Sequence, residues 1–375
     1  MIKTTAPGLG PFLTSPILVN FSASQTLNHL IRDMENKDTE APWNEIIPQI
    51  AIHTIEQARR GEPVIILSTW DEVEAPPWIL FPLLLEGQAT VIFGEKGLGK
   101  STLCLIIASC LILPWQDNPF SFIINEKCHP VLYLDWEANH KIVQNQLRKM
   151  QRGMGLPCYE MSYRRCMLPL AEDLEQVMRH VQDVKAEVII FDSLGLAAGG
   201  ELNDSGPAIA FFNALRQLNT TALIVGQTAK DKDKPRTIYG NAFYTYLARS
   251  IWQIASVHEP GDTEMNIGLF HRWANYSAKH HPLGFKLSFS ENTIEVAPED
   301  PKTVSEFRDL LGSRQQILAE LKDGPREAKE LAEALGLPRE TVNKTLYRMK
   351  LRGQVVLLPN KTWGMTILKP SDTPM

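Results

Sequence analysis

Residues 94–101 read Gly-Glu-Lys-Gly-Leu-Gly-Lys-Ser, the complete pattern G-x-x-x-x-G-K-S. The run 89–93 before it is short, apolar and β-branched, which is typical of a buried strand. The apolar run 102–108 after it predicts a buried helix. A strand, a glycine loop and a helix N-terminus together form an anion cradle, because backbone N–H groups can point at phosphate oxygens. This stretch therefore predicts a binding site for a nucleoside triphosphate.

Two side chains of the loop have defined parts in such a site. Lys100 is expected to reach the β- and γ-phosphates, and the Ser101 hydroxyl is expected to hold Mg²⁺. The expected cofactors are therefore ATP and Mg²⁺. The expected nucleotide-binding residues are Gly94, Glu95, Lys96, Gly97, Leu98, Gly99, Lys100, Ser101 and Thr102.

Size and composition are those of an ordinary globular protein. The chain has 375 residues, of which 44% are hydrophobic and 22% charged, enough for one large core with smaller appendages. No apolar run approaches the ~20 residues that a membrane span needs. The five cysteines form no C-x-x-C pair, which favours a reducing compartment. We expect a cytoplasmic protein with no membrane partner.

Charge is distributed unevenly along the chain. Residues 301–375 hold 13 Lys and Arg against 9 Asp and Glu, a balance of +4, whereas the whole chain carries −5. Residues 1–300 therefore carry −9. A basic C-terminal part on an acidic body indicates an anionic partner for that part.

Apolar runs alternate with helical stretches after the glycine loop. Strands that are apolar on both faces and alternate with helices predict an α/β fold with a mostly parallel sheet covered on both sides. The predicted strands after the loop are 130–135, 187–192, 221–226, 250–256, 266–271 and 284–290.

Four regions follow from these patterns. Residues 1–62 form an accessory region with helices at 24–35 and about 47–60, and Pro48 is expected in the first turn of the second helix. Residues 63–298 form the nucleotide-binding core. Residues 299–312 are expected to be a linker, and residues 313–375 a small C-terminal domain.

Polar residues that follow the strands are the candidates for chemistry, because ligands of open α/β folds bind at the carboxyl ends of the strands. Asp192 is expected to hold Mg²⁺, and its alternative is a helix N-cap. Glu137 is expected to polarise the attacking water, with Asp135 as a competitor. Gln227 either senses the γ-phosphate or caps its strand.

The order of these parts resembles the RecA-like ATPases of the hexameric-helicase branch, close to plasmid and phage RepA helicases and KaiC/DnaB-like ATPases. The resemblance covers roughly residues 70–290. It is carried by segments 94–101, 132–137, 189–194, 225–230 and 240–252. The first and third segments are specific, and the others contribute through their order.

The resemblance implies roles for three residues. It implies that Glu137 is the catalytic base, that Gln227 senses phosphate, and that Arg249 reaches the nucleotide of a neighbouring protomer in a ring, most commonly a hexamer. The alternative for Arg249 is a surface salt bridge. The chain departs from the family where many members have a lysine, because Trp273 occupies that position. Arg272 could supply the charge instead.

Two loops are candidates for contact with single-stranded DNA. The first is the small-residue stretch 197–206, and the second is 230–236. The second offers cations that could follow a phosphate backbone, although the interleaved Asp231 and Asp233 are more typical of a solvated loop. Its cations are Lys230, Lys232, Lys234 and Arg236.

The C-terminal region resembles a winged helix-turn-helix over about residues 313–367. Three short helices are followed by a predicted hairpin at 354–365. The resemblance implies that the third helix enters a DNA major groove and that the hairpin tip touches the backbone, although such domains also dock proteins. The expected DNA-binding residues here are Arg339, Thr341, Asn343, Lys344, Arg348, Lys350 and Lys361.

Together these features predict a Mg²⁺-dependent ATPase that forms a homo-oligomer and moves along DNA as a replicative helicase of a plasmid, phage or mobile element. One alternative is an ATP-dependent DNA-binding switch that does not unwind DNA. Another is a clock- or signalling-type ATPase whose C-terminal domain docks a protein.

Overall fold

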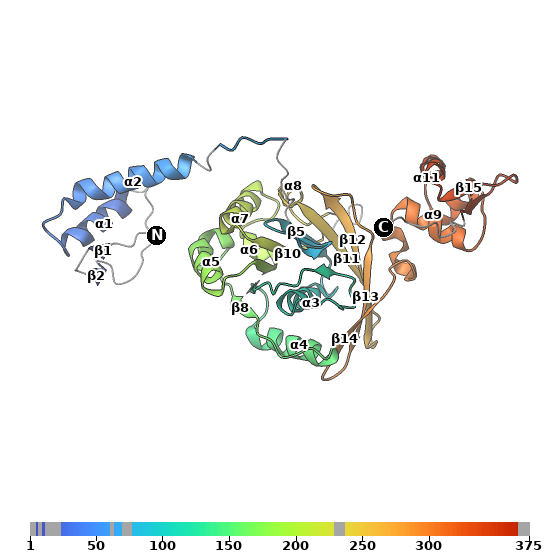
Figure 1. The fold of residues 1–375 in the computed structure, drawn as a ribbon, viewed down its shortest axis with the longest axis horizontal. Coiled ribbons are helices and arrows are strands. Elements are labelled where there is room, and N and C mark those ends of the chain that lie inside the picture. Colours follow the sequence, from blue (N-terminus) through green and yellow to red (C-terminus); the bar gives the residue numbers. More distant parts are fainter. Residues whose placement is uncertain are drawn as a thin grey trace. The chain divides into compact units, whose positions relative to one another are not determined.

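The computed structural model describes residues 24–60, 64–69, 77–228 and 237–366, and the backbone of two short strands, β1 (Thr5–Ala6) and β2 (Gly10–Pro11). The chain separates into two compact units, Met1–Glu74 and Ala75–Met375. Each unit is described by itself below (Figure 1).

The first unit contains a helical hairpin made of α1 (Ser24–Glu35) and α2 (Trp43–Arg60). Leu30 and Met34 pack against Trp43 and Ile47. The predicted bounds of α1 are confirmed. The predicted start of α2 is wrong by four residues, because Trp43 packs into the hairpin and begins the helix. Pro48 therefore lies inside α2 and not in its first turn.

A nine-stranded sheet forms the centre of the second unit, in the order β14-β13-β12-β11-β5-β10-β9-β7-β8. The strands from β11 to β8 in that order run parallel, and β12 to β14 continue the sheet antiparallel. The bounds are β5 Ala89–Gly94, β7 Val131–Asp135, β8 Ser162–Arg165, β9 Val188–Asp192, β10 Thr221–Gln227, β11 Ser250–Val257, β12 Glu264–Ala274, β13 Leu283–Phe289 and β14 Ile294–Pro298. The predicted α/β fold is confirmed.

Helices cover both faces of this sheet (Figure 1). One face packs against α3 (Lys100–Ile112) and α4 (His140–Gly153), and the other against α5 (Leu170–Val184), α6 (Leu194–Ala198) and α7 (Ser205–Leu218). Strand residues alternate between the two cores, as Ile92 and Val91 do on β5. Residues 102–111 of α3 are all buried, which explains why its sequence is apolar all round.

Smaller elements complete this unit. A three-stranded sheet joins β3 (Trp78–Phe81), β4 (Leu84–Leu85) and β6 (Ile123–Ile124), and α8 (Phe243–Leu247) precedes β11. The stretch expected as a linker contains a 3-10 helix, η1 (Ser305–Leu310). Its Phe307 is buried against Phe270 of β12, so this stretch is packed onto the sheet.

The C-terminal residues have a core of their own. Helices α9 (Ser313–Lys322), α10 (Ala328–Leu335) and α11 (Arg339–Leu351) precede a hairpin of β15 (Val355–Leu357) and β16 (Trp363–Met365). Ile317, Leu331 and Leu346 are fully buried among them. An isolated antiparallel β-bridge pairs Arg326 with Trp363, so a third short segment lies beside the hairpin. The three predicted helices and the predicted hairpin are present.

Candidate nucleotide site and the opposite edge of the sheet

The glycine loop lies between β5 and α3, as predicted. Gly97 and Gly99 have φ angles of 85° and 78°, a left-handed conformation that glycine adopts without strain. A Cβ atom on Gly94 would lie 2.5 Å from Ile254 Cγ2 and 2.7 Å from its carbonyl oxygen. The loop therefore depends on glycine both for its turns and for close packing against β11.

Lys100 is the first residue of α3 and turns back over the loop. Its Nζ donates to the carbonyl oxygen of Gly94 at 3.0 Å and also to that of Glu95. Burial lowers the pKa of Lys100, and the carboxylates of Asp192 and Glu137 oppose that shift. The ammonium group is thus held beside the loop and close to the candidate carboxylates, where it can reach a phosphate.

Asp192 ends β9 and is buried beside the loop. Its Oδ2 accepts a hydrogen bond of 2.7 Å from the Tyr133 hydroxyl. Burial raises the pKa of Asp192, hydrogen bonds from Tyr133 and Ser101 lower it, and nearby Glu137 and Asp135 raise it. A hydroxyl and a carboxylate in contact are oxygen ligands of the kind that Mg²⁺ prefers. Ser101 and Asp192 therefore fit the predicted metal site.

The structure separates the roles of Asp135 and Glu137. Asp135 is buried, and its carboxylate accepts from the backbone N–H groups of Glu137 (2.7 Å) and Ala138 (2.9 Å) and from the Tyr163 hydroxyl (3.0 Å). Its hydrogen-bonding capacity is used to hold the chain that carries Glu137. Glu137 is exposed, and its carboxylate accepts from the Ser193 hydroxyl. Glu137 is the carboxylate of the two that can meet a water molecule.

Gln227 ends β10 directly beside the loop. Its Cα pairs with that of Gly94, and its backbone oxygen accepts from Tyr239 N at 2.7 Å. The side chain is exposed. By strand alternation, Gln227, Asp192 and Asp135 all point to the face that α3 covers. The structure therefore brings the predicted phosphate sensor, metal ligand and loop together at the carboxyl edge.

Sequence reasoning did not single out Tyr133, Tyr163 or Ser193, which orient the acidic residues. Tyr133 lies two residues before Asp135 on β7, so strand alternation places both on one face. The pairing of Leu134 with Phe191 then brings Tyr133 near the end of β9. The two-residue spacing was a usable signal for Tyr133, whereas the contacts of Tyr163 and Ser193 depend on how the chain turns after each strand.

Arg249 lies at the other end of the strands. Its N–H donates to the carbonyl oxygen of Ala89 at 3.2 Å, and Ala89 is the first residue of β5. The glycine loop follows the last residue of β5, about 17 Å away along an extended strand. Arg249 lies two residues before Ile251, so its side chain points to the same face of the sheet as Ile251. That face is the one that α7 covers. Arg249 therefore cannot contact the nucleotide site of its own chain.

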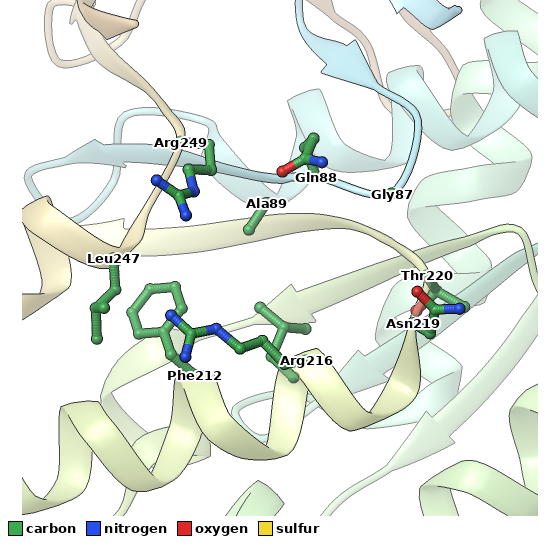
Figure 2. Close-up of a pocket in the computed structure, with 10 residues that line it drawn as sticks. Gly87, Gln88, Ala89, Phe212, Arg216, Asn219, Thr220, Leu247 and Arg249 are labelled. Carbon is green, nitrogen blue, oxygen red and sulfur yellow. The ribbon is translucent and has the colours of Figure 1, made fainter. Parts of the chain in front are cut away.

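A pocket of about 190 Å³ lies at this amino edge (Figure 2). Arg249 and Arg216, from the last turn of α7, both line it, and Figure 2 shows both guanidinium groups extending toward the part bounded by Phe212 and Leu247. Gln88 also lines the pocket, and no acidic residue does. Ion pairs of arginine within the described ranges are formed by Arg164, Arg179, Arg308 and Arg326.

Arg272, the alternative to Arg249, makes contacts within its own chain. Its Nε donates to Gln253 Oε1 at 2.7 Å, and its Nη1 donates to the Leu310 carbonyl oxygen at 2.9 Å. Its guanidinium also lies 5.2 Å from the centre of the Phe270 ring. These contacts join η1 to β11 and β12. Trp273, at the position where a lysine was expected from the resemblance, is half exposed.

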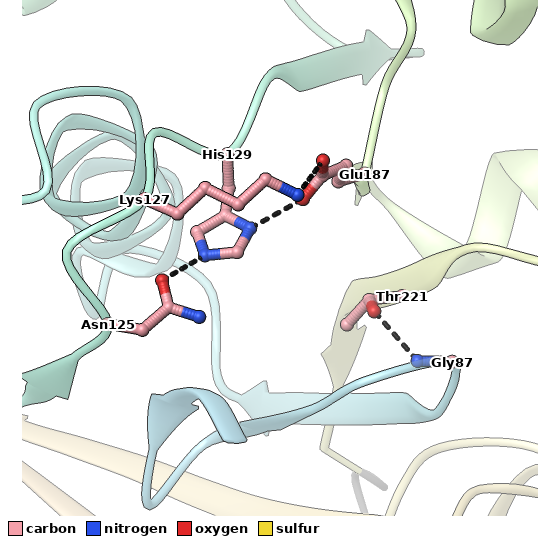
Figure 3. A network of polar contacts seen from close by, with 6 residues as sticks. All are labelled: Gly87, Asn125, Lys127, His129, Glu187 and Thr221. Atoms are coloured by element: carbon pink, nitrogen blue, oxygen red, sulfur yellow. Dashed lines mark hydrogen bonds and ion pairs between the residues drawn. The ribbon is translucent and has the colours of Figure 1, made fainter. Parts of the chain in front are cut away.

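A second polar group at the amino edge is internally neutralised (Figure 3). Glu187, just before β9, accepts from Lys127 at 2.5 Å and contacts His129 at 2.7 Å. Partial burial favours the neutral carboxyl, but the hydrogen bonds from Lys127 and His129 lower the pKa of Glu187 overall. Gly87 N donates to Thr221 Oγ1 at 2.9 Å nearby. This network ties the Glu187 carboxylate to two side chains from the segment before β7.

The two loops expected to contact DNA have different outcomes. The stretch 197–206 is shorter as a loop than expected, because Ala197 and Ala198 belong to α6 and α7 begins at Ser205. Lys230, Lys232, Lys234 and Arg236 lie outside the described residues. Their contact with DNA stays a prediction.

The basic residues expected on the third C-terminal helix lie on α11. Val342, Leu346 and Met349 form its buried face. Arg339, Asn343, Lys344, Arg348 and Lys350 are exposed, as is Lys361 between β15 and β16, whereas Thr341 is half-buried. Lys344 pairs with Glu340 at 2.6 Å, which reduces the charge it offers to a partner. Tyr347 and Leu351 are also exposed on this helix.

Comparison with known proteins gives a family match over part of the chain and similar solved structures. Residues 59–233 match the profile of a family described as an AAA domain. Among solved structures, a KaiC-like protein from the hyperthermophilic archaeon Pyrococcus horikoshii OT3 is similar over 59% of this chain and 94% of that chain, at 12% identity and a TM-score of 0.41. No curated protein matches the chain.

The strand order β11-β5-β10-β9-β7, with the glycine loop after β5 and Asp192 at the end of β9, is the arrangement of a P-loop fold. Within the described residues, no helix combines the length and apolar character needed to cross a membrane.

Proposed function

We propose that this protein hydrolyses ATP and uses the reaction to move along DNA, as a ring-forming translocase or helicase of the RepA type. The observation that carries the proposal is the pairing of an exposed Glu137 carboxylate with a loop lysine and a buried Asp192 at one sheet edge. This set has the charge and placement that phosphoryl transfer to water requires.

Each residue of the set has a part in that reaction. Glu137, oriented by Ser193, accepts a proton from the water that attacks the γ-phosphate. The bond between that phosphorus and the bridging oxygen breaks, and Lys100 stabilises the negative charge on the phosphate oxygens. Ser101 and Asp192 would hold Mg²⁺, which when bound neutralises phosphate charge. Gln227, beside Gly94, is placed to sense whether the γ-phosphate is present.

The position of Arg249 supports an oligomer. A cation at the amino edge can take part in hydrolysis only if a second copy brings its own glycine loop to that edge. A closed ring satisfies this requirement at every interface, because a head-to-tail contact repeats around it. We propose a hexamer on the basis of the resemblance to hexameric helicases.

A DNA-binding switch is a second candidate, and the exposed basic residues of α11 favour it. Arg339, Arg348 and Lys350 are exposed on a helix whose other side is packed against α9 and α10. We interpret this domain as a winged helix, in which such a helix fits a major groove of duplex DNA. A switch would bind duplex DNA when ATP is bound and would not unwind it.

The ATPase rate with and without single-stranded DNA, measured for the wild type and for Glu137→Gln, tests the proposal. We expect strong stimulation by single-stranded DNA in the wild type and its loss in the variant. A slow wild-type rate that single-stranded DNA does not change, together with tight binding to duplex DNA, would instead support the switch. Absence of any ATP hydrolysis would overturn the translocase proposal, and absence of ATP binding would overturn both.

A further inference from the structure

Helix α4 carries a row of cations on an otherwise acidic part of the chain. Residues 138–159, which contain α4, include four Lys and Arg and no Asp or Glu, whereas residues 1–300 as a whole carry −9. The four cations are Lys141, Arg148, Lys149 and Arg152. Figure 1 shows α4 at the periphery of the second unit. A basic helix at the surface of an acidic unit attracts an anionic partner.

The cations share one face of the helix. Lys141, Arg148 and Arg152 are exposed and occupy positions i, i+7 and i+11, so they follow one another along the axis over about 16 Å. Val143 and Met150 form the buried face on the other side. Within the described residues, none of the four cations forms an ion pair. Their charge is therefore available to a ligand from outside the chain.

Hollows with aromatic walls lie on both sides of this row. One, of about 420 Å³, is lined by Arg148, Tyr159 and Tyr163, and a second, of about 300 Å³, adjoins it at Arg148 and Tyr159. A third, of about 620 Å³, is lined by Lys141 and Phe289 on the other side of the helix. Proteins that bind single-stranded nucleic acid use this combination, because cations follow the phosphates while rings stack on the bases.

We infer that α4 and the hollows beside it bind a segment of single-stranded nucleic acid on the surface of the ATPase core. The inference goes beyond the proposed function, because it adds a contact away from loop 230–236 and from α11, where DNA contact was predicted. The phosphates would lie along the row from Lys141 to Arg152, and bases would enter the hollow at Tyr159.

Two features of that hollow favour nucleic acid over an acidic protein. The Tyr159 hydroxyl lies 2.5 Å from Ser109 Oγ on α3, so the ring is already held in place before a base stacks on it. Glu160 lines the same hollow. A carboxylate accepts hydrogen bonds from the amino groups of bases, whereas it repels the carboxylates of an acidic protein.

The first test measures the affinity of the full-length protein for a labelled single-stranded oligonucleotide of mixed sequence over a range of salt concentrations, without ATP. It compares the wild type with the α4-neutral variant, which combines Lys141→Gln, Arg148→Gln and Arg152→Gln. The slope of log K against log salt concentration should fall by about 2, at ~0.7 for each lost phosphate contact of a single strand. An unchanged slope would overturn the inference.

A matched control removes the same charge elsewhere in the same unit. It combines Lys185→Gln, Lys279→Gln and Lys302→Gln, three exposed lysines that lie outside α4 and its hollows. This control should keep the wild-type slope. An equal loss of slope in both triple variants would mean that net charge alone matters, and would likewise overturn the surface on α4.

Two substitutions of Tyr159 test the stacking. Tyr159→Leu removes the ring and should weaken oligonucleotide binding about tenfold. Tyr159→Phe loses the contact with Ser109 but keeps the ring, and should bind as the wild type does. Equal losses would show that Tyr159 only supports the fold. Displacement of the oligonucleotide by poly-L-glutamate as efficient as by unlabelled oligonucleotide would identify a surface for an acidic protein instead.

Failure of the α4 surface and failure of the proposed function give different results. If single-stranded DNA stimulates ATP hydrolysis and the α4-neutral variant keeps the wild-type salt slope, only the α4 surface is wrong. If binding depends on α4 but DNA does not stimulate hydrolysis, the translocase proposal fails and the surface stands. Thermal unfolding of each variant shows whether a lost affinity reflects a lost fold.

Discussion

The two edges of the nine-stranded sheet differ in their charge and in the side chains that they present. The carboxyl edge combines Lys100 with the carboxylates of Asp192, Asp135 and Glu137 on the α3 face. The amino edge presents Arg249 and Arg216 on the α7 face. The first edge has the groups that could bind and position a nucleotide, and Arg165 ends β8 at that same edge. The second edge has arginines without an anion.

Under the proposed function, this difference means that one chain holds two halves of a catalytic site on opposite sides. The strands that separate the halves are rigid and buried, so no local movement of a side chain can join them. Under the proposed function, a second copy joins them, and hydrolysis should depend on assembly. The following changes either break the comparison between the two edges or sharpen it.

The largest effect is expected at the carboxyl edge for Lys100→Ala. Hydrolysis should fall to background, because the ammonium group that stabilises charge on the transferring phosphate is removed. The fold should survive, since the hydrogen bonds of Nζ go to two loop carbonyl groups. Phosphate release and a thermal melt measure the two properties. Undiminished hydrolysis would refute the assignment of the site.

Two substitutions at the same edge should have different effects: Glu137→Gln should lower catalysis, and Asp135→Asn should lower stability. Glu137→Gln should lower kcat about 10²–10⁴-fold, the range for loss of a general base, with little effect on stability. Asp135→Asn should lower stability by about 1–3 kcal/mol, because a buried acceptor of two backbone N–H groups is weakened. Chemical denaturation and kinetics of both variants check this. The reverse pattern would exchange the two roles.

On β12, His271 should make stability depend on pH. His280 N donates to Nδ1 of His271 at 3.1 Å, and the ring stacks on Trp252 with centroids 4.2 Å apart. Burial lowers the pKa of His271 to about 4. The folded protein thus binds fewer protons than the unfolded chain between pH 4 and about 6.5. Stability should be full above that window and decrease as pH falls through it.

The size of this decrease is at most about 3.4 kcal/mol, because the shift is about 2.5 pKa units and each unit is worth about 1.36 kcal/mol. Urea unfolding at a series of pH values measures it, with His271→Gln as the matched variant. The variant should have lower stability at neutral pH and a flatter dependence between pH 4 and 6.5. An equally steep dependence in the variant would assign the effect to other groups.

The smallest effect is expected for Tyr133→Phe at the carboxyl edge. The Tyr133 hydroxyl donates to Asp192 and thereby lowers the pKa of that carboxyl against the effect of burial. Without this bond the pKa of Asp192 rises further. The acidic limb of the kcat/KM profile should therefore move to higher pH, by about one unit for a hydrogen bond to a charged group. An unmoved limb would mean that Asp192 does not control it.

Sequence reasoning predicted the carboxyl edge better than the amino edge. The glycine loop and Asp192 are set by local patterns, since each begins at the last residue of an apolar strand. The division of labour between Asp135 and Glu137 was not predictable, because it depends on the turn that brings two N–H groups onto Asp135. The polar strand β8 gave no apolar signal and was missed.

The pocket at the amino edge could not be predicted for a different reason. Its two arginines come from the end of α7 and the start of β11, which become neighbours only when the helix packs across the sheet. Arg272 appeared equivalent to Arg249 in sequence, yet its contacts with Gln253 and Leu310 use it inside the chain. Tertiary packing decides which cation faces outward.

Mixing Arg249→Ala with Lys100→Ala tests most directly the claim that the site is divided between two copies. Each variant alone should hydrolyse ATP at background rates, because every interface lacks one half of the site. In an equimolar mixture, interfaces that pair an intact loop with an intact Arg249 should restore a measurable part of the wild-type rate. A mixture that shows only the average of the two variants, while both still assemble with each other, would contradict the account.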